Sequence, residues 1–358
     1  MISYAETKRV FLLLGMACNF KCRYCIQRSL VLTGLSKKVS EETITFLQKL
    51  ADEQPRNRRV RETLRVNLMG GEPLLYYETV CDLIKRVNRK NIEWAFPTNG
   101  SLVTPEIVDF INKNNIKIFL SHDGPQTEKL RGVDVLNNPE VFECLKAINR
   151  LGVDALITAY SQDIYALRKF INDKFERKIP IKTGFLNLAS PVPEDIINYD
   201  LHSWKSTCEL MSKNALKQFL DHEQGWESSM YKLPISAYYG FIEGRKQICS
   251  CSTFGNKINV DTKGRVWLCT DGQFLVGNTS SSCPELHQET EKKFVRLYQE
   301  NKRYCIESCH WYPYCLGHCP RETMTAQQKK QCEFLGIFYA SVESLIHEYE
   351  ATSQNNFH

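Results

Sequence analysis

Three cysteines stand close together near the start of the sequence. Cys18, Cys22 and Cys25 are separated by three and then two residues, and they directly follow an apolar run at positions 10–14. Three thiolates at this spacing can bind three irons of a cubane cluster, whereas a fourth cysteine would complete an electron-transfer cluster. The fourth iron of such a cluster would have no cysteine ligand, which predicts that a substrate or cofactor binds to it. A structural zinc site is the alternative, because short cysteine pairs are common zinc ligands.

A glycine-rich segment follows the second apolar run. Positions 64–68 have the pattern of a buried strand, and Gly70, Gly71 and Glu72 come next. Glycines let the backbone approach a ligand closely, and a carboxylate at a strand end can accept hydrogen bonds from an ammonium group. An ordinary loop is the alternative for this segment taken alone.

The cysteine loop, followed at this distance by Gly-Gly-Glu, resembles the radical S-adenosylmethionine (radical SAM) enzymes. In that family the loop follows the first strand and binds a 4Fe-4S cluster, while the Gly-Gly-Glu segment ends the second strand and holds the amino group of SAM. The resemblance implies two sets of ligands, Cys18, Cys22 and Cys25 for the cluster and Gly70, Gly71 and Glu72 for SAM.

Short apolar runs alternate with helical patterns along the first half of the chain. We predict strands at 11–15, 64–68, 92–96, 116–120, 153–159 and 181–186, with helices at 41–51, 79–87, 105–112, 140–150 and 164–173. Strand-helix units in succession indicate parallel strands with right-handed crossovers, in a barrel or an open wound sheet. The radical SAM resemblance selects an α/β fold with an incomplete (β/α)6 TIM-like barrel.

Polar residues follow the third and fourth predicted strands. Asn99 precedes a glycine, and Ser121 opens a Ser-His-Asp-Gly-Pro segment. Both segments are also common turn sequences, but function in parallel α/β folds lies at the carboxyl ends of strands. The resemblance implies that Asn99 and Ser121 contact SAM. It also implies that Arg131 pairs with the SAM carboxylate and that Tyr24 lies beside the adenine. We interpret His122 as a turn residue and not as a catalyst.

Cysteines return in the second half of the chain, after a break at Pro191 and a long helical pattern at 201–221. A hairpin pattern at 256–268 lies between two of them. This region resembles the SPASM domain of some radical SAM enzymes, although three residues separate Cys305 from Cys309 where that domain usually has two. The resemblance implies two auxiliary 4Fe-4S clusters, the first bound by Cys249, Cys251, Cys269 and Cys319 and the second by Cys305, Cys309, Cys315 and Cys332. Two zinc sites with the same thiolates are the alternative.

The length and composition of the chain limit how many domains it can form. A chain of 358 residues that is 42% hydrophobic can form one large domain and a smaller one. We predict a radical SAM partial barrel at 1–190, a helical bridge at 191–245, a small cysteine-rich SPASM domain with a β-hairpin at 246–340, and a helix end and tail at 341–358.

Several classes of protein are disfavoured. The sequence has no run of eighteen apolar residues and no export signal pattern, so we expect a cytoplasmic protein without a membrane span. In a reducing compartment, fifteen cysteines point to metal binding or catalysis and not to disulfides. The net charge of +5 is modest, and the basic runs lack aromatic interleaving, so we expect no nucleic-acid partner.

The family resemblance implies a peptide maturase. The cluster would pass an electron to SAM, and the resulting 5'-deoxyadenosyl radical would remove a hydrogen from a ribosomally made peptide. Auxiliary clusters suit oxidative formation of a carbon-carbon, ether or thioether crosslink.

Two alternatives remain open. One is an anaerobic sulfatase-maturating enzyme, which forms formylglycine from Ser or Cys. Those enzymes place an aspartate directly after the cysteine that matches Cys269, whereas here Thr270 intervenes before Asp271, our candidate catalytic residue. The other is a non-catalytic iron-sulfur or zinc protein, which the cysteine loop beside Gly-Gly-Glu argues against.

The predicted chemistry needs partners. These are a precursor peptide and an electron donor such as flavodoxin or ferredoxin. Many relatives carry a leader-binding domain before the barrel, which captures the peptide by strand addition. Few residues precede the first predicted strand here, so we expect no such domain. The substrate would then be recognised by barrel and SPASM surfaces or through a separate leader-binding protein.

Overall fold

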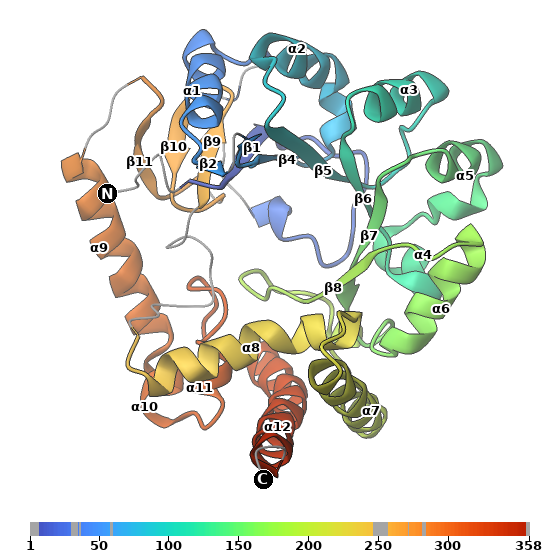
Figure 1. Ribbon diagram of the computed structural model, residues 1–358, viewed down its shortest axis with the longest axis vertical. Coiled ribbons are helices and arrows are strands. Elements are labelled where there is room, and N and C mark those ends of the chain that lie inside the picture. The colour runs from blue at the N-terminus through green and yellow to red at the C-terminus, as the bar shows by residue number, and fades with distance from the viewer. Residues whose placement is uncertain are drawn as a thin grey trace. The chain divides into compact units, whose positions relative to one another are not determined.

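The protein packs as two compact units. The computed structural model describes residues 7–29, 35, 37–57, 60–245, 257–270, 272–280 and 284–355 (Figure 1). The first unit comprises residues 1–156, 167–184 and 252–294, and the second comprises residues 157–166, 185–251 and 295–358.

The first unit is built on one open sheet of nine strands, in the order β11-β10-β9-β1-β4-β5-β6-β7-β8. Neighbouring strands from β1 through β4, β5, β6 and β7 pair in parallel. The strands are β1 (Arg9–Gly15), β4 (Leu64–Gly70), β5 (Ile92–Thr98), β6 (Lys117–Ser121), β7 (Leu151–Ile157), β8 (Ile181–Phe185), β9 (Lys257–Asp261), β10 (Arg265–Trp267) and β11 (Leu275–Asn278), beside a separate hairpin of β2 (Arg56–Asn57) and β3 (Val60–Arg61). The predicted incomplete (β/α)6 barrel is confirmed, and each predicted barrel strand corresponds to an observed one.

Helices cover the outer face of this sheet (Figure 1). They are α1 (Glu41–Asp52), α2 (Tyr77–Val87), α3 (Pro105–Lys113), α4 (Thr127–Arg131), α5 (Pro139–Lys146) and α6 (Ile164–Phe175). Short 3-10 turns lie in the connections and are η2 (Ile26–Ser29), η3 (Pro73–Tyr76), η4 (Gly124–Gln126) and η5 (Val135–Asn137). The apolar faces of the helices pack on the strands, because the strands themselves are buried runs such as Val10, Leu12 and Leu14, all fully inaccessible.

Capping residues determine where these helices begin and end. Ser40 Oγ accepts a hydrogen bond from the backbone N–H of Thr43 at 3.2 Å at the start of α1. The helix predicted at 140–150 ends four residues early, at Lys146. The reason is Asn112, whose side-chain amide binds the carbonyl of Ala147 at 2.9 Å and the N–H of Asn149 at 2.9 Å.

The hairpin predicted at 256–268 is confirmed as β9 and β10, which are antiparallel. It does not stand apart, because β9 pairs in parallel with β1, with Leu12 opposite Val260. Packing therefore groups the hairpin with the barrel strands. The boundaries predicted for a separate 246–340 domain stay a prediction.

The second unit is helical. Its elements are η6 (Glu194–Ile196), α7 (Leu201–Leu220), α8 (Trp226–Ile242), α9 (Pro284–Asn301), whose first half belongs to the first unit, α10 (Arg303–Ser308), α11 (Tyr312–Cys315) and α12 (Ala326–Asn355). Helices α7, α8 and α12 share a core in which Phe334 stacks on Trp204 with ring centroids 4.4 Å apart. The expected bridge is thus part of a packed bundle.

The last helix, α12, runs from Ala326 to Asn355. Thr325 Oγ1 accepts from the backbone N–H of Gln328 at 3.1 Å, so α12 begins at Ala326 and includes Cys332. No helix among the described residues is long and apolar enough to cross a membrane.

Candidate functional site

The cysteine loop and the Gly-Gly-Glu segment leave the sheet side by side. The N–H of Gly71 donates to the carbonyl of Gly15 at 2.9 Å, and the N–H of Glu72 donates to the carbonyl of Ala17 at 2.9 Å. A Cβ on Gly70 would lie 2.4 Å from the Gly15 oxygen, and one on Gly71 would lie 2.1 Å from the Ala17 oxygen. Both glycines are therefore required because backbone approaches backbone, which fixes where the cysteine loop starts.

Glu72 is buried at the carboxyl end of β4, with 1% of its surface exposed. Its Oε1 accepts from the N–H of Leu74 at 3.0 Å and the hydroxyl of Thr98 at 2.8 Å, and Oε2 accepts from the N–H of Asn99 at 2.7 Å. Burial raises the pKa of Glu72, and these three donors oppose the rise. The carboxylate thus joins the end of β4 to the end of β5.

Asn99 connects the same strand end to the cysteine loop. Its Nδ2 donates to Oδ1 of Asn19, the residue after Cys18, at 2.8 Å, and Asn19 Nδ2 donates to Oγ of Ser101 at 2.8 Å. Asn99 Oδ1 in turn accepts from the hydroxyl of Ser101 at 2.7 Å. This closed set of amides holds one side of the loop over the end of β5.

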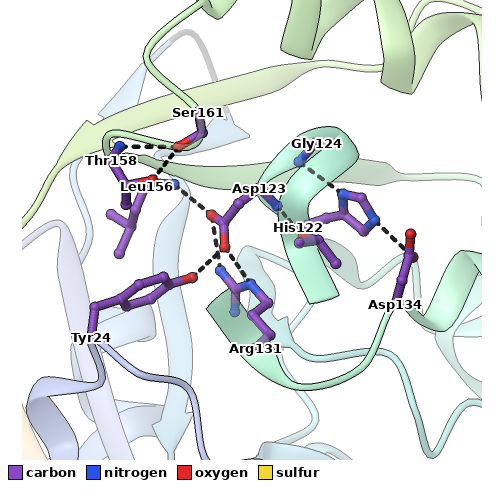
Figure 2. A network of polar contacts seen from close by, with 10 residues as sticks. Tyr24, His122, Asp123, Gly124, Arg131, Asp134, Leu156, Thr158 and Ser161 are labelled. Atoms are coloured by element: carbon purple, nitrogen blue, oxygen red, sulfur yellow. Dashed lines mark hydrogen bonds and ion pairs between the residues drawn. The ribbon is translucent and has the colours of Figure 1, made fainter. Parts of the chain in front are cut away.

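A buried carboxylate holds the other side of the loop. Figure 2 shows Asp123, which is inaccessible to solvent, between Arg131 and Tyr24. Arg131 donates from Nε to Oδ2 at 2.7 Å and from Nη2 to Oδ1 at 3.3 Å, while the Tyr24 hydroxyl also donates to Oδ2. The N–H of Leu156 donates to Oδ1 at 2.9 Å, and the Arg131 guanidinium lies 5.4 Å from the Tyr24 ring centroid.

The same network positions two of the residues predicted to contact SAM, Tyr24 and Arg131. Tyr24 directs its hydroxyl to Asp123, and burial raises its pKa. Arg131 uses two of its five N–H donors on Asp123, so its Nη1 group remains available to a further carboxylate. Ser121 is half-buried at the end of β6, the strand that leads directly to Asp123.

His122 is fully buried and belongs to the scaffold. Its Nδ1 accepts from the N–H of Gly124 at 3.1 Å, so Nε2 carries the proton and donates to Asp134 at 3.0 Å (Figure 2). The bond lowers the pKa of Asp134 although burial opposes this. The interpretation of His122 as a turn residue agrees with these contacts.

The three loop thiols lie within electrostatic range of one another. Cys18 is exposed, while Cys22 and Cys25 are half-buried. Burial raises the pKa of Cys18 and of Cys22, and Cys25 raises both further. In the described part of the chain, no group of three or more His, Cys, Asp or Glu side chains converges on a point that a single metal ion could occupy.

A second group of thiols surrounds a cavity of 660 Å³ in the second unit. The four cysteines that line it come from α10, the turn after it, α11 and α12; they are Cys305, Cys309, Cys315 and Cys332. Burial raises the pKa of Cys315 to about 12, and a backbone N–H from Gly317 donates to its sulfur at 3.3 Å. These are the four residues predicted to share one auxiliary cluster.

Three polar side chains, those of Lys302, His318 and Tyr339, line the same cavity. Lys302 Nζ lies 3.7 Å from Glu322 Oε2, and the Tyr339 hydroxyl is 3.0 Å from His318 Nε2. Desolvation, together with the charge of Lys302, lowers the pKa of His318 to about 4. The cavity thus has a neutral imidazole and a paired lysine beside its thiols.

The structure describes only some of the remaining predicted residues. Cys269 follows β10 in the first unit, and Cys319 follows α11 in the second. Cys249, Cys251 and Asp271 lie outside the described residues. The ligand set of the other auxiliary cluster and the role of Asp271 stay predictions.

Sequence reasoning missed three residues that organise the site. Asp123 was part of a segment read as turn chemistry, and neither Asn19 nor Asp134 was singled out. An aspartate at a strand end, eight residues before an arginine near a helix end, is the signal that could have found the Asp123–Arg131 pair.

Comparisons with known proteins identify the domain. Residues 12–174 match the family model described as the Radical SAM superfamily. The radical SAM cyclopropyl synthase TigE of Paramaledivibacter caminithermalis is 23% identical over 88% of this chain and 68% of its own. The serine-type anaerobic sulfatase-maturating enzyme of Bacteroides thetaiotaomicron is 23% identical over 86% of this chain and 81% of its own.

Two solved structures share the fold. Native anSMEcpe with bound AdoMet aligns over 95% of this chain and 99% of its own, with a TM-score of 0.61 and 17% identity. Streptococcus suis SuiB bound to S-adenosylmethionine aligns over 90% and 75%, with a TM-score of 0.57 and 16% identity. The cysteine loop and the Gly-Gly-Glu segment both lie within the matched residues. Residues 12–174 therefore form a radical SAM domain, and this chain is an enzyme that uses SAM and an iron-sulfur cluster.

Proposed function

We propose that this enzyme oxidatively modifies a peptide, forming a carbon-carbon, ether or thioether crosslink in a ribosomally made precursor. The observation that carries the proposal is the second group of thiols, Cys305, Cys309, Cys315 and Cys332 around one cavity, in a chain that already has a radical SAM domain. A radical SAM domain alone generates the radical. A further iron-sulfur centre provides a place for the second electron of a two-electron oxidation.

The donor set of the cavity fits a cubane cluster. Four thiolates can also bind zinc, so metal analysis must distinguish the two. A cubane distributes its four ligands over four irons, and four thiolates are the donor set that it takes. The residues present therefore fit the group.

In this proposal, residues of the first unit bind the cluster and SAM. When bound, the cluster of Cys18, Cys22 and Cys25 together with SAM supplies a 5'-deoxyadenosyl radical. Asn99 and Asp123 hold the cysteine loop from two sides, so the thiols are ordered before SAM binds. Arg131, oriented by Asp123, offers its Nη1 donors to the SAM carboxylate.

The activities for which the relatives are named support a modification of carbon centres. TigE is a cyclopropyl synthase, and a cyclopropyl ring is closed by a carbon-carbon bond. Structures of anSMEcpe include complexes with bound AdoMet and peptides. We infer a peptide substrate for this enzyme from these likenesses together with the two thiol groups. A reduced flavodoxin or ferredoxin as electron donor and a separate leader-binding protein complete the proposal.

Formation of formylglycine is the second candidate. Both serine-type and cysteine-type sulfatase-maturating enzymes are similar to this chain over 85% or more of its length. The displaced aspartate, with Thr270 between Cys269 and Asp271, is the feature that ranks this candidate second.

Iron analysis tests the auxiliary site. Anaerobically reconstituted Cys305→Ala should lose about four irons per chain relative to the wild type, whereas Cys208→Ala, a buried core thiol outside the cavity, should lose none. The Cys18→Ala, Cys22→Ala, Cys25→Ala triple variant should keep its auxiliary iron and form no 5'-deoxyadenosine with SAM and dithionite. Cys319→Ala should spare the cluster of Cys305. Tightly bound zinc in place of iron would contradict the proposal.

Product analysis separates the two reactions. The enzyme is incubated with SAM, dithionite and a precursor peptide encoded beside its gene, and in parallel with a sulfatase-derived peptide. A crosslink removes two hydrogens and creates no carbonyl, so a hydrazide reagent should not label the product. Hydrazide labelling of the sulfatase peptide, with the neighbouring peptide unchanged, would reverse our ranking.

A further inference from the structure

Lys302 lines the four-cysteine cavity and forms a buried ion pair with Glu322. Lys302, at the junction of α9 and α10, and Glu322, between α11 and α12, each expose 4% of their side chain. Lys302 Nζ and Glu322 Oε2 are 3.7 Å apart. Burying two charges is costly, and it contributes little to stability compared with an apolar pair. Stability therefore does not explain why both charges are buried, whereas a role in function does.

The contacts keep the two charges in place. Glu322 Oε1 accepts from the backbone N–H of Leu188 at 2.9 Å, and Oε2 accepts from the N–H of Cys319 at 3.3 Å. The Lys302 side chain lies along Gly317, where an added Cβ would come within 3.1 Å of Lys302 Cγ. Lysine is thus confined beside the thiols while its carboxylate partner is anchored to backbone.

The other charged side chains that line the cavity are different. Lys329 and Glu333 line it as well, but both are exposed to solvent. Water and salt screen exposed charges strongly, and they screen a buried charge much less. Lys302 is therefore the cavity-lining cation whose field solvent screens least.

We propose that Lys302 is a positioning residue that raises the reduction potential of the cluster bound by Cys305, Cys309, Cys315 and Cys332, and that Glu322 fixes its place and partly offsets its charge. This inference rests on the proposed function, which places a cluster in the cavity. One-electron reduction takes a 4Fe-4S core from +2 to +1 without adding a proton. A nearby cation stabilises the reduced form more than the oxidised form, so it raises the potential.

A raised reduction potential makes the cluster more useful in an oxidative modification. Removal of one hydrogen atom leaves a substrate radical. Completing a two-electron oxidation then requires one further electron and one proton to leave the substrate. A higher potential makes the auxiliary cluster a better acceptor for that electron, and the reduced cluster must later be reoxidised by a soluble electron carrier.

The test is an EPR-monitored redox titration of the full chain. The background carries Cys18→Ala, Cys22→Ala and Cys25→Ala, so that only auxiliary clusters respond, and dithionite supplies the electrons. Cys305→Ala in this background identifies the signal of the cavity cluster. In Lys302→Met we expect a lower potential, with the ratio of reduced to oxidised cluster changed about tenfold at a given potential, or ~59 mV. In Glu322→Gln we expect a higher potential, and in Lys302→Arg an unchanged one.

The opposite signs separate an electrostatic role from a structural one. A merely structural pair would give both Lys302→Met and Glu322→Gln the same loss of iron or the same direction of shift, and that outcome would overturn the inference. Unchanged potentials with full iron content would also overturn it. If the background protein holds no auxiliary iron at all, the proposed function fails together with this inference, and iron counting makes that case distinct.

Discussion

Replacing Asp123 by asparagine should destabilise the first unit strongly. The change keeps the shape of the side chain but removes its charge, and it leaves the Arg131 guanidinium, which is 9% exposed, without its counter-ion. The amide nitrogen of asparagine cannot accept from Arg131 or from Tyr24, so a donor faces a donor. Breaking a buried ion pair on one side costs about 3–5 kcal/mol.

Urea unfolding of the reconstituted enzyme, followed by far-UV circular dichroism, measures this loss. With a denaturant slope of about 1–3 kcal/mol per molar urea, the expected loss lowers the unfolding midpoint by about 1–5 M. The control is Asp173→Asn, which removes an exposed carboxylate from its helical pair with Lys169 and should cost less than about 0.5 kcal/mol.

A double variant completes the test. Asp123→Asn combined with Arg131→Met removes both charges, so it should be less destabilised than the sum of the two single changes. If Asp123→Asn unfolds at the same midpoint as the Asp173→Asn control, the buried pair does not hold the cysteine loop and the account of the site given above is wrong.

Three further predictions concern the same unit. Gly71→Ala should cost about 1–3 kcal/mol or more, because its Cβ would overlap the Ala17 carbonyl, whereas Gly184→Ala, whose Cβ would meet only Leu156 at 3.6 Å, should be close to neutral in the same urea assay. Glu72→Gln should weaken SAM binding, which calorimetry measures. It should also cost about 1–3 kcal/mol of stability, since an amide nitrogen would face the N–H donor of Leu74 or Asn99. If neither the affinity for SAM nor the stability changes, Glu72 neither binds SAM nor stabilises the site. Burial tends to raise the pKa of Glu93, but Arg150 and Arg65 hold it below its usual value, so this contact stabilises the fold above pH ~4.5 and the stabilisation is lost as pH falls through the lowered pKa. Glu93→Gln should therefore cost about 1 kcal/mol near neutral pH and progressively less below pH ~4.5, and a difference that persists in acid would contradict this account.

The sequence alone indicated the radical SAM domain and the parallel strands. Cysteine spacing and Gly-Gly-Glu are local patterns, and in strands such as Leu64–Gly70 buried residues alternate with more exposed ones, because successive side chains point to opposite faces. Strand positions could be predicted because this pattern has a short period and needs no knowledge of distant residues. The helix predicted at 140–150 failed at its end because Asn112, far along the chain, supplies the bonds that stop it.

Only the tertiary structure decided which groups hold the site together. Asp123 meets Tyr24, which lies 99 positions away, and Asn99 meets Asn19, which lies 80 positions away. Lys302 and Glu322 likewise pair across a segment that contains α10 and α11, whose path no local pattern specifies. The joining of β9 to β1 is of the same kind, because a strand's edge has the same backbone donors and acceptors for any partner. Local sequence determines which residues can do chemistry, whereas long-range packing determines which of them are buried together and which charges each one meets.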